Sequence, residues 1–148
     1  MTKKEVEAAH EKLLALQKII HLEFHLKDVL QVIIGASILA IPVGFTEETW
    51  NLGQTLPLIN IIGILLLSLL FISIFVYYNY YENHIKTHWD ELIKRIFSTY
   101  LFSFIVVAAI LTLIQRTPWT TDLLLAFKRS VLVAFPASMS ASVADMIK

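Results

Sequence analysis

Four long runs of apolar residues, almost free of charge, decide what this chain can fold into. They cover about residues 29–45, 56–78, 96–114 and 122–147. A helix needs about 20 mostly apolar residues to cross a bilayer, and only helices and closed barrels satisfy their backbone hydrogen bonds in lipid. The content of hydrophobic residues, 57%, exceeds the roughly 45–50% of soluble domains. The sequence therefore predicts an all-α, polytopic membrane protein with four transmembrane helices, which make up a domain over residues 28–148.

The charged segment before the first span, residues 1–27, is predicted to form an N-terminal amphipathic cytoplasmic helix. Its apolar side chains recur every three or four residues, which is typical of a short heptad seam: Val6, Ala9, Leu13, Leu16 and Ile20. Such a helix lies on the membrane, packs on its own bundle or pairs with a second copy. No helix-breaking residue separates it from the first span, so one long helix through both also fits the pattern.

Basic residues near the spans indicate the orientation of the chain. With the N-terminus inside, nine of the 12 lysines and arginines lie in the cytoplasm and at most three lie outside. Both termini of this multi-pass cell-membrane protein are therefore predicted to be cytoplasmic. Trp50 and Trp119 then share the outer interface, and the four tyrosines between residues 77 and 81 share the inner one. The polar segment 79–95 extends the second span, the third span or both.

Composition narrows the classes of function. The formal net charge is zero, whereas a nucleic-acid binder needs a basic face. Cysteine is absent, so disulfides and thiolate ligands are excluded. The sequence holds no nucleophile motif and no glycine-rich phosphate loop, and we expect no enzyme. The expected partners are the lipid bilayer, further copies of the chain and inorganic ions, and the one cofactor left open is a metal cation.

Small residues recur every four positions on the first and fourth spans, which lets helix backbones approach closely in lipid. They are Ala36, Ala40, Gly44, Ala134, Ala137 and Ala141. The simplest interpretation is packing between these spans or against a neighbouring subunit. The alternative is a pathway past kinks at Pro42 and Pro136, lined by Ser138 and Ser142 and closed by Asp145.

Two adjacent carboxylates, Glu47 and Glu48, follow the first span at its predicted outer end. In a symmetric oligomer they would form an acidic ring, which concentrates and selects cations. They could equally form a solvated turn, or pair with Lys128 and Arg129, which begin about two turns into the fourth span. Such pairing would cancel the negative field and could favour an anion.

Two pairs of histidines have helical spacing, which places each pair on one helix face. They are His21 with His25, and His84 with His88, all predicted on the cytoplasmic side. If the pairs met, four imidazoles could bind a zinc-like ion or sense pH. The alternative is that they are ordinary histidines at the membrane interface.

The stretches GASILAIPVGFTEETW (35–50) and FPASMSASVADM (135–146) resemble a family of small prokaryotic integral membrane proteins of unknown function. The resemblance extends as a general pattern over most of the chain. It implies a membrane location and about four spans, and it carries no established activity or site.

Together these features favour a homo-oligomeric, cation-conducting channel with an acidic outer mouth and a serine-lined fourth helix. Four short spans are too few to enclose a wide path in one subunit, and assembly around an axis would solve this. Two alternatives remain: a small proton- or metal-coupled secondary transporter, and a membrane scaffold or accessory subunit that transports nothing.

Overall fold

The computed structural model describes residues 2–22, 25–81 and 88–147, and the side chains of these residues except 18–22. In this described part of the chain every regular element is a helix, and no strand is present. Its elements are α1 (Lys3–Leu22), α2 (Leu26–Gly44), α3 (Glu47–Thr55), α4 (Leu58–Val76), the π-helix η1 (Tyr77–Tyr81), α5 (Trp89–Leu113) and α6 (Leu123–Met146). The predicted all-α, polytopic membrane fold is confirmed, since four of these segments are long and apolar enough to cross a membrane.

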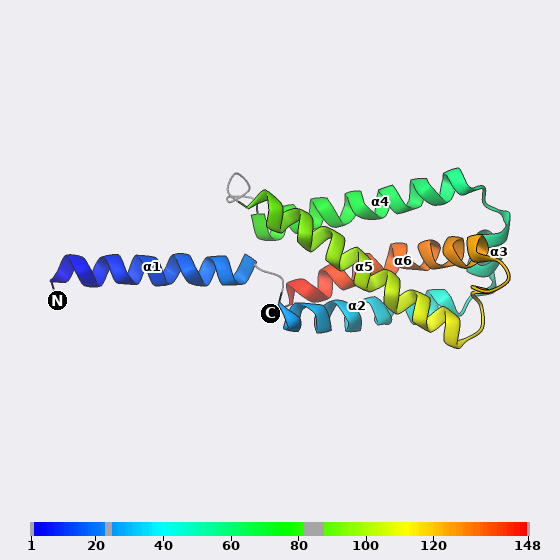
Figure 1. The fold of residues 1–148 in the computed structure, drawn as a ribbon, viewed down its shortest axis with the longest axis horizontal. Coiled ribbons are helices and arrows are strands. Elements are labelled where there is room, and N and C mark those ends of the chain that lie inside the picture. Colours follow the sequence, from blue (N-terminus) through cyan, green and yellow to red (C-terminus); the bar gives the residue numbers. More distant parts are fainter. Residues whose placement is uncertain (1, 23–24, 82–87, 148) are drawn as a thin grey trace.

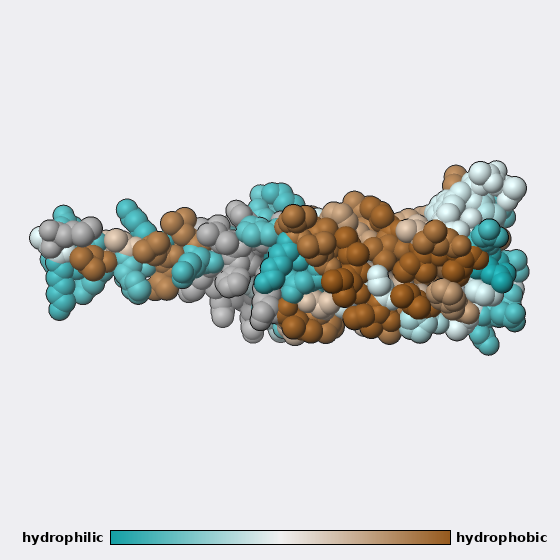
Figure 2. Space-filling model, turned by 90° about the horizontal axis from the view of Figure 1, so that it is seen from below, coloured by the Kyte–Doolittle hydropathy of each residue, from teal (hydrophilic) through white to brown (hydrophobic). Residues whose placement is uncertain are grey.

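The four long helices α2, α4, α5 and α6 form one elongated bundle (Figure 1). We call the end where α2 and α5 begin and α6 ends the arm end, because α1 projects from it. The opposite end is the α3 end, where α3 joins α2 to α4. Apolar residues cover the middle of the bundle, and hydrophilic residues gather at both ends (Figure 2). The bundle helices hold 19 to 25 residues, which at about 1.5 Å per residue suits a bilayer core about 30 Å thick.

Helix α6 is the central helix of the bundle, since it packs against α2, α3, α4 and α5. Its most extensive interface is with α2. The six small residues singled out in the sequence are all buried, and most of them belong to one core cluster. The backbones come closest at Gly35, where an added Cβ would collide with Ala144 and with the backbone at Ala141. The small-residue stripe therefore lies between two helices of the same subunit.

The structure corrects two expectations drawn from the sequence. Residues 46–55, where a solvated turn was one of the alternatives for Glu47 and Glu48, contain the nine-residue helix α3. Glu47 and Glu48 lie in its first turn, where a helix dipole favours negative charge. A continuous helix from the arm into the first span is also wrong: α1 ends at Leu22, and α2 begins afresh after His25, whose backbone is extended. The carboxylate of Asp28 accepts the His25 backbone N–H at 3.0 Å, which stabilises this new start.

Helix α1 stands away from the bundle (Figure 1). The described side chains of its heptad seam remain in solvent, since Val6, Leu13 and Leu16 are each more than half exposed. Among the described elements, none covers this part of the seam.

Candidate functional site

The most unusual feature of the bundle is a buried group of charged and phenolic side chains at the arm end. We call it the Arg95 cluster, and it consists of Asp28, Tyr80, Tyr81, Arg95 and Asp145. Arg95 is fully buried, although it lies in the first third of a membrane-spanning helix. Its Nη1 lies 2.5 Å from Oδ2 of Asp145, and its Nη2 lies 3.4 Å from Oδ2 of Asp28. One guanidinium therefore joins α2, α5 and α6.

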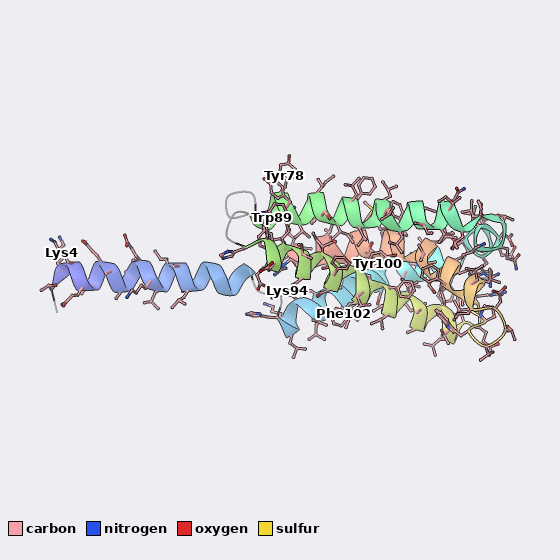
Figure 3. The ribbon with its side chains drawn as sticks, turned by 45° about the horizontal axis from the view of Figure 1, so that its top comes forward. Lys4, Tyr78, Trp89, Lys94, Tyr100 and Phe102 are labelled. Carbon is pink, nitrogen blue, oxygen red and sulfur yellow. The ribbon has the colours of Figure 1, made fainter. Side chains whose placement is uncertain are left out.

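The π-helix at the end of α4 supplies the phenolic part of the cluster. The ring of Tyr80 lies 4.4 Å from Cζ of Arg95, and its hydroxyl donates to the backbone carbonyl of Asp145 at 2.9 Å. Tyr81 is fully buried. Tyr78, from the same π-helix, points away from the bundle (Figure 3). Short π-helical turns occur often at functional sites, and this one places the Tyr80 ring over a buried cation and buries Tyr81.

The two aspartates lie in opposite helix environments. Asp28 is in the first turn of α2, where the dipole stabilises a carboxylate. Asp145 is in the last turn of α6, where the dipole disfavours one. The shorter contact of Arg95 is with Asp145, so the arginine is closest to the carboxylate that most needs a cation.

The cluster carries one positive and two negative charges among the residues that the structure describes, a formal net charge of −1. Lys94 does not join it, because its side chain is 65% exposed and pairs with Glu91; Figure 3 shows it at the start of α5, near Trp89. Charged side chains within a membrane are costly, and they commonly mark ion or proton pathways. A buried carboxylate in such a centre can bind a proton, which removes its charge.

Buried hydroxyls continue from the cluster toward the middle of the bundle. Thr99 and Ser103 follow Arg95 at four-residue intervals on α5, and Ser142 and Ser138 precede Asp145 on α6. The serine hydroxyls donate to carbonyls of their own helices, which leaves their lone pairs as acceptors. The Thr99 hydroxyl is buried without a hydrogen-bond partner among the described residues, and such a group can bind a water molecule.

The structure separates the residues predicted to line a pore. Asp145, Ser142 and Ser138 are buried in the arm half of the central helix. Glu47 and Glu48 are exposed at the opposite end of the bundle. None of the ion pairs in the described part of the chain joins these glutamates to Lys128 or Arg129.

The histidine prediction lies partly outside the described residues, which include neither the side chain of His21 nor any of His84. His25 is exposed just before α2, and His88 is half-buried just before α5. In the part of the chain that is described, no three histidine or carboxylate side chains are grouped so that they could hold a metal ion.

Sequence reasoning found Asp145 but missed its partners. Arg95 was counted only as a cytoplasmic charge, Asp28 only as the boundary of the first span, and the tyrosines only as interface residues. Helix α5 has a central part in the cluster, because it carries Arg95. One signal was present in the sequence: acidic and basic residues at three span ends that share one side of the membrane.

Comparison with known proteins supports the membrane assignment. Searches of the curated proteins and of the solved structures gave no match. Residues 2–147 match the sequence profile of a family described as "Putative integral membrane protein (DUF2391)". The chain therefore belongs to this family of integral membrane proteins.

Proposed function

We propose that this protein is a proton-coupled membrane transporter and that the Arg95 cluster is its charge-carrying centre. The observation that carries the proposal is the sharing of one buried guanidinium by two buried carboxylates, Asp28 and Asp145. A packing element alone would not favour this arrangement, because apolar residues of similar volume are often as stabilising as a buried ion pair, or more so.

The charges around the centre define one proton-binding step. Asp28 faces it from α2, Tyr80 and Tyr81 from η1, and Asp145 from α6. Glu91, one turn before Arg95, is paired with Lys94. One proton on either aspartate would remove the charge of that carboxylate and weaken the hold of Arg95 on that helix. Proton binding at the arm end would thus be coupled to the separation of α6 or α2 from α5.

The central position of α6 favours a transporter over an axial channel. The serines predicted to line a pore lie within one subunit, packed among α2, α4 and α5, rather than on an outer face where copies could meet. Secondary transporters place their coupling sites between helices of a single bundle. The cation channel is the second candidate, and the exposure of Glu47 and Glu48 favours it, because rings of acidic side chains select cations.

Reconstitution into proteoliposomes tests the proposal. A pH-sensitive dye inside the vesicles reports proton movement driven by gradients of Na⁺, K⁺ or Mg²⁺, supplied one at a time. We expect slow, saturable proton movement that Asp145→Asn abolishes and that Glu47→Gln leaves unchanged. Both variants must keep the wild-type elution volume and helical circular dichroism.

Other outcomes would reject the proposal. Unitary current steps in planar bilayers, altered by Glu47→Gln or Glu48→Gln, would identify a channel. If no flux were measured under any gradient, both transport functions would be rejected and the membrane scaffold would remain. Full activity in Asp145→Asn would remove the Arg95 cluster from the mechanism.

A further inference from the structure

A second charged group, of three cations, lies at the α3 end, where Arg129 is buried, Lys128 is half-buried and Arg116 is exposed. We call it the basic corner, and it consists of Arg116, Lys128 and Arg129. Arg129 is 9% exposed. Its Nε donates to the carbonyl of Trp50 at 3.2 Å, and its Nη1 donates to the carbonyl of Arg116 at 2.6 Å. It therefore ties α3 and the α5–α6 connection to α6 through neutral partners.

The other two cations lie close to this arrangement. Lys128 donates to the carbonyl of Leu56 at 2.7 Å. The guanidinium of Arg116 stacks on the ring of Trp50, with 3.7 Å from Cζ to the ring centroid. Gly53 makes room for the corner, because an added Cβ would collide with Cγ of Arg129. The corner is thus built into the packing of α3 on α6.

The three cations of the corner take part in none of the ion pairs among the described residues. Among the described residues, Arg129 contacts two backbone carbonyls, Lys128 contacts one, and Arg116 stacks on an aromatic ring. Neutral partners satisfy donors but do not balance positive charge, and neighbouring cations repel one another. The corner therefore favours an anion, and Lys128 and Arg116 have further donors for it.

A polar hollow of about 250 Å³ lies beside the corner, with Lys128, Gly53 and Gln54 among its lining residues. Asp122 also lines it. The Asp122 carboxylate accepts the backbone N–H of Leu125 and caps α6, and its negative charge also acts on Arg129. The three cations of the corner together with Asp122 carry a formal net charge of +2. The hollow lies beside α3 where two spans begin, and the ends of spans lie near lipid headgroups.

We infer that the basic corner binds a phosphate group, supplied by the headgroup of an anionic phospholipid. Lys128, which lines the hollow, would contact the phosphodiester oxygens, as lysine commonly does with phosphate, while Arg116 and Arg129 would add positive charge from the same corner. This inference does not depend on the transport proposal, because it concerns the opposite end of the bundle and its test measures no flux.

The test measures the melting temperature of delipidated full-length protein in detergent. Phosphatidylglycerol at about a hundredfold excess over its dissociation constant should raise it by roughly 5–10 °C. Phosphatidylcholine, which carries no net charge, should raise it much less. The double variant Arg116→Gln/Lys128→Gln should lose most of the shift, and Lys94→Gln, an exposed lysine at the arm end, should keep it. The measured quantity is the lipid-induced shift, so a lower starting temperature in the double variant does not affect the result.

Inorganic phosphate is added separately to identify the source of the anion. A shift equal to that of phosphatidylglycerol would overturn the lipid assignment in favour of a soluble phosphate ion. An unchanged lipid response in the double variant, or equal responses to the two lipids, would overturn the site itself. Native mass spectrometry should show one bound phosphatidylglycerol per wild-type subunit, reduced at least tenfold in the double variant.

Discussion

Replacing Arg95 with methionine would test how much the buried cluster contributes to the fold. The substitution keeps an unbranched but shorter side chain and removes the charge, so the buried Asp28 and Asp145 lose the guanidinium that they share. Removing one partner of a buried ion pair typically costs about 3–5 kcal/mol. We expect a loss of that size, because the fully buried guanidinium serves both carboxylates.

Single replacements of the aspartates should cost less. Asp145→Asn or Asp28→Asn brings the formal charge of the cluster from −1 to zero, so neither leaves an unpaired buried charge. Asp145→Asn should be the more damaging, because Asp145 lies 2.5 Å from the guanidinium and Asp28 lies 3.4 Å from it. The triple variant, which carries all three changes, should recover most of the stability that Arg95→Met loses.

The assay is reversible unfolding in mixed micelles, followed by the fluorescence of the three tryptophans. Lys94→Met is the matched control, because Lys94 is the residue next to Arg95 but is exposed and paired with Glu91 on the surface. Such surface pairs contribute about 0–1 kcal/mol to stability. If Arg95→Met destabilised the protein no more than Lys94→Met, the Arg95 cluster would not hold the arm end together.

Three further predictions follow from the packing. Gly35→Ala should destabilise the bundle in the same unfolding assay, because its methyl group would collide with Ala144, whereas Gly63→Ala should be tolerated, since nothing lies within 4 Å of an added Cβ there. Tyr80→Phe should cost about 0.5–1.5 kcal/mol, because it removes one hydrogen bond to the Asp145 carbonyl; no change in unfolding would place that bond outside the native state in solution. Deleting α1 should leave the bundle folded by circular dichroism, because α1 has no extensive contact with it, and should lower the oligomer mass in light scattering if its seam joins copies.

Hydropathy and length were enough to predict the spans, because a bilayer imposes both on any helix that crosses it. Helix α3 escaped prediction for the opposite reason. Its nine residues are mostly polar, and its position depends on the fit of Gly53 against Arg129, a contact 76 residues apart in the sequence. A local pattern cannot contain that information.

The Arg95 cluster was only partly predictable. Asp145 stands out because it interrupts an apolar helix. Arg95 does not, because it lies where a polar connection gives way to a span, and a count of basic residues treats it as a surface charge. Its burial depends on how α2 and α6 converge at the arm end and on the π-helical turn that brings Tyr80 over it. These are properties of the assembled bundle.

The π-helix also has a mechanical consequence. Its hydrogen bonds join residues five apart, one residue further than those of an α-helix. The five residues of η1 therefore turn through a smaller angle per residue than those of α4 before them. Rewinding them as α-helix would turn Tyr80 and Tyr81 by roughly a quarter of a revolution about the helix axis. Both rings would then rotate away from their present positions, and Tyr80 would leave the guanidinium of Arg95, while every residue stayed helical. A change of helix type at the end of α4 could therefore alter the surroundings of Arg95 without unfolding α4.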